Sequence, residues 1–216
     1  GFQSRVLRRI VANGIPSFVI ETMAGAVIFI FNRAILTIEG DLGVAAYSIV
    51  ANLSLFCAAV FNGIGQGIQP IISINYGAKK FQRVYDTVKL AVYTSLAVGI
   101  AFFLMGLIFP KQLASIFIKG ENPQLLSMSM RGIRLYFISF ILMGLNTVLL
   151  SFLQSKEYAR ESISISLGRG SVFILIGIII LPKLFGIDGV WLTIPLAEAM
   201  TLVYSIGVHE LCREAL

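Results

Sequence analysis

Charged residues, histidine and cysteine are all scarce in this 216-residue sequence. Only 13% of the residues are charged, whereas a soluble globular domain has about 25%. The single histidine, His209, follows the last apolar segment, so neither a catalytic Ser–His pair nor a histidine metal site is expected among the apolar helices. The two cysteines, Cys57 and Cys212, have neither metal-ligand spacing nor the pattern of a disulfide framework.

Motifs for enzyme chemistry are also absent. The sequence contains no Walker motif, no His-Glu-x-x-His and no Gly-x-Ser-x-Gly, which are common signatures of nucleotide hydrolysis, zinc proteolysis and acyl transfer. We therefore expect no enzyme activity, no metal site and no organic cofactor. Any pumping by this chain must be driven by an ion gradient or by a partner.

Apolar residues, by contrast, make up 57% of the chain, and the mean hydropathy is +0.88. Long apolar runs recur along the sequence and indicate an all-α membrane protein, with the lipid bilayer as a partner. The net charge of +6 could instead suggest nucleic-acid binding. However, the basic residues lie mostly between the apolar runs, as the positive-inside rule predicts, so we expect no nucleic-acid partner.

Six apolar segments can be drawn, and the length of each is near that required to span a bilayer, which is about 20 residues. They span about 14–38, 44–76, 84–109, 125–154, 162–181 and 189–208. We expect residues 13–208 to form one six-helix transmembrane bundle, between a cytoplasmic connector (1–12) and a cytoplasmic tail (209–216). Basic residues at the N-terminus, around Lys79 and around Lys156 then predict an inner-membrane protein with both ends of this segment in the cytoplasm.

The second segment is rich in amides. At helical spacing, Asn62, Gln66 and Gln69 fall on one face, and Asn146 adds an amide in the fourth segment. Such amides either hold helices together or line a polar cleft that binds substrate. The residues expected to kink the helices or shape their ends are Pro70, Gly77 and Pro195.

Two carboxylates lie within the apolar segments, Glu21 in the first and Glu198 in the sixth. A carboxylate at such a depth costs on the order of 3 kcal/mol, so each needs a partner or a function. Glu21 shares a helical face with Asn32. Glu21, Asn32 and Glu198 are therefore candidates for binding a coupling Na⁺ or H⁺. The alternative is a structural role, in which each acid is paired with a base, with water or with a neighbouring helix.

Two stretches resemble the multidrug and toxic compound extrusion (MATE) family of secondary transporters. The sequence GIGQGIQP at 63–70, followed by NYGA at 75–78, is similar to the family's glycine- and glutamine-rich helix end. The last hairpin of the family is matched by Arg169, Leu181-Pro182, the sequence GIDGVW at 186–191, Pro195 and Glu198. In order and spacing, the resemblance covers nearly the whole chain.

The resemblance implies a twelve-helix protein of two six-helix lobes that face each other across a cleft. This chain would be the C-terminal lobe, and its partner would be the N-terminal lobe of the same transporter. Family members extrude drugs and organic or amphiphilic cations, driven by inward flow of Na⁺ or H⁺, as the lobes rock between two openings. Glu21 lies about one turn from the position of the family's acid, and the fourth segment has no acid between Leu135 and Gln154.

Two alternatives stay open at the level of the sequence. A flippase for lipid II or a lipid-linked oligosaccharide, from the same superfamily, would line its cleft with cationic side chains. The amides of the second segment suit it less well. A non-transporting scaffold or an inactive half-length fragment is the other alternative, and six helices preceding Gly1 in the gene would argue against it.

Overall fold

The computed structural model describes the backbone of residues 4–118 and 122–214, and the side chains of 22–23, 25–118 and 122–207. Every regular element in these ranges is helical, so the predicted fold class is confirmed. In chain order the elements are α1 (Ser4–Gly77), α2 (Phe81–Ile108), α3 (Pro110–Ser115), α4 (Pro123–Tyr136), α5 (Ser139–Ser155), α6 (Ala159–Leu167), the π-helical turn η1 (Gly168–Val172), α7 (Phe173–Phe185) and α8 (Ile187–Glu214).

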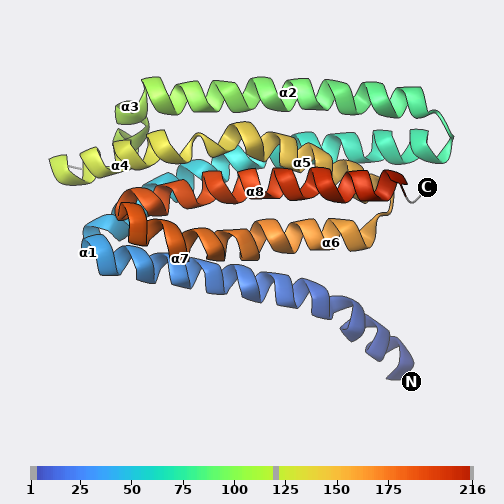
Figure 1. The fold of residues 1–216 in the computed structure, drawn as a ribbon, viewed down its shortest axis with the longest axis horizontal. Coiled ribbons are helices and arrows are strands. Elements are labelled where there is room, and N and C mark those ends of the chain that lie inside the picture. The colour runs from blue at the N-terminus through green and yellow to red at the C-terminus, as the bar shows by residue number, and fades with distance from the viewer. Residues whose placement is uncertain (1–3, 119–121, 215–216) are drawn as a thin grey trace.

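Helix α1 contains the first two predicted segments. It reverses direction at Gly40, whose backbone angles are φ 62° and ψ −153°, a combination that is essentially restricted to glycine. Figure 1 shows the two limbs of α1, residues 4–39 and 41–77, running antiparallel on either side of this turn. The helix stays within helical angles across Pro70, where the sequence predicted a bend.

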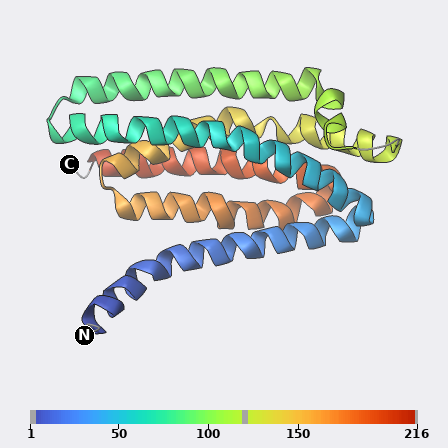
Figure 2. The same ribbon diagram turned by 180° about the vertical axis from the view of Figure 1, so that it is seen from behind.

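The remaining crossings follow the predicted order. Four helices of the described chain are long and apolar enough to span a membrane, and the pair α4–α5, bent by 43°, would make a fifth. The first of these, Gly25–Gly77, is itself two crossings because of the reversal at Gly40. The result is the six-crossing bundle expected from the sequence. Figures 1 and 2 show α2 and the first limb of α1 at opposite edges of it.

The fourth predicted segment, 125–154, consists of two helices, α4 and α5, and neither proline nor glycine lies at the bend between them. The bend coincides with a cluster of aromatic rings. Phe137 and Phe140 are in edge-to-face contact, with ring centroids 4.8 Å apart, and Phe137 packs against Gly106 of α2. The fully buried ring of Phe137 thus occupies the space that a side chain at position 106 would need, and this close contact lies at the bend.

The segments that the sequence assigned to the cytoplasm lie together at one end of the bundle. The start of α1, the turn that contains Lys79, the turn that contains Lys156 and the end of α8 lie at one end (Figure 1). The reversal at Gly40, helix α3 and the turn at Gly186 lie at the other end. This alternation is what the predicted topology requires, and the assignment of the first end to the cytoplasm stays a prediction from the positive-inside rule.

A turn of one kind closes both hairpins at the end opposite Lys79. Gly40 and Gly186 both have positive φ, at 62° and 58°, and each begins the sequence Gly-x-x-Gly-Val. The second glycine of the later turn, Gly189, is buried, and a Cβ there would overlap the carbonyl group of Leu181. The close approach of α7 and α8 therefore depends on Gly189 having no side chain.

We predict that Gly189→Ala lowers stability by about 1–3 kcal/mol, because the methyl group would displace a backbone carbonyl. Gly67→Ala is the matched control, since nothing lies within 4 Å of a Cβ at Gly67 and alanine favours a helix over glycine by about 1 kcal/mol. Thermal unfolding of the detergent-purified protein measures both. Equal melting temperatures for the two variants would contradict the tight α7–α8 contact.

Candidate functional site

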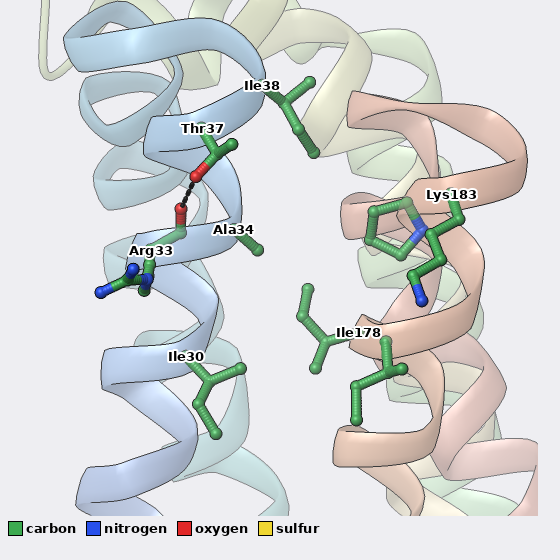
Figure 3. Close-up of a pocket in the computed structure, with 9 residues that line it drawn as sticks. Ile30, Arg33, Ala34, Thr37, Ile38, Ile178 and Lys183 are labelled. Carbon is green, nitrogen blue, oxygen red and sulfur yellow. Dashed lines mark hydrogen bonds between the residues drawn. The ribbon is translucent and has the colours of Figure 1, made fainter.

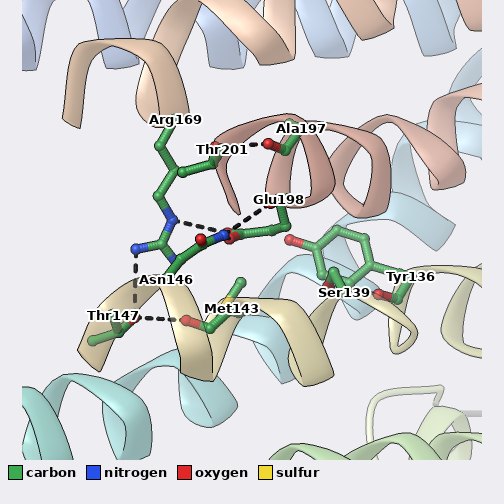
Figure 4. A network of polar contacts seen from close by, with 9 residues as sticks. All are labelled: Tyr136, Ser139, Met143, Asn146, Thr147, Arg169, Ala197, Glu198 and Thr201. Atoms are coloured by element: carbon green, nitrogen blue, oxygen red, sulfur yellow. Dashed lines mark hydrogen bonds and ion pairs between the residues drawn. The ribbon is translucent and has the colours of Figure 1, made fainter. Parts of the chain in front are cut away.

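The functional site begins with a local irregularity in the fifth crossing. Helix α6 passes into α7 through the π-helical turn η1, which carries Arg169. One-turn π-helices are rare, and those that occur are often found at functional sites. The extra residue turns a side chain away from its regular helical position. Here it directs Arg169 from η1 toward α5 and α8 (Figure 4).

Arg169 forms an ion pair with Glu198 of α8. Its Nη2 and Nε atoms lie 2.9 Å and 3.0 Å from the same carboxylate oxygen, Oε1. The side chain of Glu198 is only 6% exposed and that of Arg169 is 21% exposed. In such a setting the loss of either partner leaves a charge that is buried without compensation, which is why buried pairs are sensitive to single substitutions.

Two residues of α5 complete the network. The Nδ2 atom of Asn146 donates to the Glu198 backbone oxygen at 2.9 Å and to Oε2 at 2.6 Å. The hydroxyl of Thr147 accepts a long hydrogen bond of 3.4 Å from Arg169 Nη1 and donates to the Met143 carbonyl. The Oδ1 atom of Asn146 is buried and has no hydrogen-bond partner within the described part of the chain. The network thus joins α5, η1 and α8 through one carboxylate.

A cavity of about 350 Å³ lies beside the ion pair. Polar groups on its wall include Arg169, Glu198, Ser166 and Tyr136, and most of the rest is apolar. Figure 4 shows the Tyr136 hydroxyl pointing toward Glu198 from the side opposite Arg169. Pro195 lies one turn before Glu198 in α8 and is buried, and its ring removes one backbone hydrogen bond from this part of the helix. The arrangement offers a buried carboxylate next to a space that a small solute can enter.

A groove of about 460 Å³ lies elsewhere, between the first limb of α1 and α7 (Figure 3). Its walls are isoleucine-rich, and its charged lining residues are Arg33 and Lys183, both exposed. Because both charges are positive, this groove is a poor site for a cation. The network around Glu198 is the stronger candidate.

Comparison with known proteins identifies the family. The family model described as MatE matches residues 16–185, which is most of the chain. The chain belongs to the MATE family.

Related sequences are named for drug export. The chain is 24% identical over 207 residues to the multidrug export protein MepA of Staphylococcus haemolyticus, covering 93% of this chain and 45% of that protein. It is 23% identical over 212 residues to MepA of Staphylococcus aureus, with coverage of 98% and 46%. The chain therefore spans about half the length of the curated relatives that it matches.

Solved MATE structures have the same fold as this lobe. An inward-facing multidrug resistance MATE transporter superposes with a TM-score of 0.86 at 16% identity, covering 100% of this chain and 51% of that one. An outward-facing structure gives 0.81 at 16% identity, with coverage of 99% and 49%. A further superfamily transporter, from Pyrococcus furiosus, also gives 0.81 at 16% identity, with coverage of 97% and 47%. The expected two-lobed architecture accounts for the half coverage.

The structure joins one ion-coupling candidate of this MATE lobe, Glu198, to a residue predicted for the substrate cleft. Glu198 and Asn146 are in direct contact, although the sequence assigned Asn146 to a substrate cleft. Asn32 is half-buried on the first limb of α1. Glu21 belongs to the same limb, but its side chain lies outside the described residues. The coupling roles of these residues stay predictions.

The amide stripe of the second limb divides into two parts. Asn62 and Gln66 are exposed on the surface of the lobe. Gln69 is half-buried, and its Nε2 atom donates to Oε1 of Gln154 at 2.9 Å, which joins α1 to α5. Gly77 ends the limb just before the turn to α2. One amide therefore holds helices together, while two remain available to a partner or a solute.

Arg169 is the site residue that reasoning from the chain alone missed as a partner of Glu198. A signal was present: an isolated arginine and an isolated glutamate occur in consecutive apolar segments. Isolated charges within membrane segments usually find each other, because each is costly alone. No pattern in the sequence predicted the π-helical turn that directs Arg169 toward Glu198.

A double-mutant cycle tests the energetic importance of the pair. We predict that Arg169→Met or Glu198→Met alone lowers stability by about 3–5 kcal/mol, and that the double variant recovers most of the loss. Arg131 and Asp188 form the comparison pair, since Arg131 is 67% and Asp188 24% exposed, so this pair should lie nearer the about 0–1 kcal/mol that exposed pairs contribute. Denaturant unfolding in detergent measures all variants. A coupling energy no larger than that of the comparison pair would contradict a buried, stabilising pair.

Proposed function

We propose that this chain is the C-terminal lobe of a multidrug efflux antiporter of the MATE family. In this function, Na⁺ or H⁺ moves inward and drives the extrusion of drugs or other organic and amphiphilic cations by alternating access. The family membership, the drug-export names of the relatives and the half coverage of those relatives support the proposal. The protein would be a multi-pass protein of the cell membrane with both ends of this segment in the cytoplasm.

The observation that carries the proposal is the exposed amide face on the second limb of α1. Asn62 and Gln66 are exposed, and nothing lies within 4 Å of a Cβ built on the neighbouring Gly63 or Gly67. Amides and bare backbone are unfavourable against hydrocarbon, which offers them no hydrogen bonds. A second lobe across an aqueous cleft would supply water and substrate as partners. Asn62 and Gln66 would then bind varied substrates by hydrogen bonds.

The coupling cation would bind at a buried or partly buried carboxylate of the lobe. Glu198 is buried beside a cavity, and Glu21 is the other candidate, with Asn32 on its limb as a possible helper. No organic cofactor is required, because the ion gradient supplies the free energy.

The flippase alternative is less well supported by the same face. A pyrophosphate carrier needs several cationic side chains in its cleft, whereas Asn62 and Gln66 are neutral. Arg169, the arginine of the buried network, is neutralised by Glu198. Complementation of a lipid II flippase defect, without any change in drug resistance, would favour the flippase.

If Glu21 takes part in binding the coupling cation, Glu21→Gln should abolish ion-driven drug extrusion in the full-length transporter without lowering its expression. The amide keeps the size of the side chain but removes the negative charge that would hold Na⁺ or accept a proton. Drug efflux from energised, drug-sensitive cells and quantitative immunoblotting measure the two effects. Extrusion at the unmodified rate would exclude Glu21 from coupling.

A second prediction concerns the amide face. In the full-length transporter, Gln66→Leu should change drug susceptibility by about two- to tenfold, to a degree that differs between substrates, because one hydrogen bond contributes about 1 kcal/mol. Gln82→Leu is the control, since Gln82 is an exposed amide at the start of α2 that bonds to Asp86. Inhibitory concentrations for a panel of cationic drugs measure the change. Identical profiles for both variants would argue against a substrate-binding role of this face.

A further inference from the structure

We propose that Arg169 is a resident counter-ion that leaves Glu198 when the coupling cation binds there. Cation entry and release of the arginine would then be one event at a site formed by α5, η1 and α8. The inference rests on the proposed cation-coupled function and specifies the residues that exchange the cation. The ligand class is a monovalent cation, Na⁺ or H⁺.

The charge at the site favours an exchange of one positive charge for another. Arg169 supplies the single positive charge that balances Glu198. A sodium ion at the carboxylate would restore the same balance, and a proton bound to the carboxylate would remove the need for it. A buried glutamate left without any of the three would be strongly unfavourable. Departure of Arg169 is therefore linked to arrival of a cation.

The unpartnered oxygen of Asn146 is an independent sign of a ligand. Buried amide oxygens are nearly always hydrogen-bonded, yet Oδ1 of Asn146 is buried without a partner in the described part of the chain. The same residue holds Glu198 through Nδ2, so its oxygen lies close to the carboxylate. With the Thr147 hydroxyl, which now accepts from Arg169, these atoms form a set of oxygen ligands of the kind that Na⁺ prefers over nitrogen.

Arg169 is held in a way that permits release. Both of its contacts with Glu198 go to one oxygen, so the strongest two-oxygen geometry of arginine and carboxylate is not formed. Its bond to Thr147 is long, at 3.4 Å. The adjoining cavity of about 350 Å³, which Arg169 itself lines, gives the guanidinium a space into which it can move. The π-helical turn provides a backbone that can shift locally.

Among the side chains that the structure describes, few other titratable groups face the pair. Tyr136 of α4 lies across the carboxylate (Figure 4), and the part of α5 in the network contributes only Asn146, Thr147 and the Met143 carbonyl. Further along α8, Tyr204 is hydrogen-bonded to Ser164 of α6. A response to Na⁺ or pH that depends on both Arg169 and Glu198 therefore reports on this pair.

Cation-induced thermal stabilisation of the purified full-length transporter tests the proposal without any transported drug. Melting temperatures are measured against NaCl at constant ionic strength, with choline chloride as the balance, and against pH without Na⁺. For Arg169→Gln we expect the Na⁺ midpoint to fall by about tenfold, or the pH midpoint to rise by about one unit, because the competing charge is gone. For Glu198→Gln we expect the response to disappear. Arg131→Gln, which breaks the ion pair between Arg131 and Asp188 outside this network, should keep the unmodified midpoint.

The Na⁺ and pH titrations identify the cation, and they distinguish failure of this exchange from failure of the proposed drug antiport. A Na⁺ midpoint that shifts at fixed pH identifies Na⁺, and a pH midpoint that shifts without a Na⁺ response identifies H⁺. Should Arg169→Gln fail to fold, Arg169→Lys keeps the charge but loses the guanidinium fork, and a smaller shift in the same direction is expected. Midpoints equal to those of the unmodified protein in the Arg169 variants, or a response that survives Glu198→Gln, would overturn the proposal. Shifted midpoints in a transporter that extrudes no drug would refute drug antiport and leave this exchange intact.

Discussion

Polar groups within a membrane helix must find partners, and this constraint organises the whole lobe. The one buried acid of the described bundle that reaches a base, Glu198, is neutralised by Arg169 and held by Asn146. Because these residues belong to α8, η1 and α5, a single carboxylate ties together three of the crossings. The apolar side chains around them pack or face lipid, and they are interchangeable in a way that the ion pair is not.

The same constraint explains what the lobe leaves unpaired. Asn62 and Gln66 lie exposed on the second limb of α1, where lipid would offer no hydrogen bond. Gln69, one turn further along, has a partner within the bundle. The contrast divides the amide stripe into a part that joins two helices and a part that is exposed on the lobe. Under the proposed function, the exposed part would face the cleft and a second lobe.

Much of the fold follows from local sequence, and much of the site does not. The six apolar segments were sufficient to predict the crossings, because hydrophobic length is a local property of the sequence. The bend after Tyr136 was not predictable, since it arises where Phe137 meets Gly106 of another helix. The partner of Glu198 was missed for a similar reason. The extra residue of η1 shifts Arg169 out of the regular helical period on which sequence patterns depend.

We infer that the amide face of this lobe meets water in the intact transporter, whereas other exposed faces meet lipid. Accessibility of single cysteines to a membrane-impermeant thiol reagent measures this directly, in full-length protein from which all native cysteines, Cys57 and Cys212 included, have been removed. Gln66→Cys should react and be protected by a bound cationic drug, whereas Leu90→Cys should not react, although Leu90 is 67% exposed on α2 at the edge of the bundle. Equal, drug-insensitive labelling at both positions, or none at position 66, would contradict the claim.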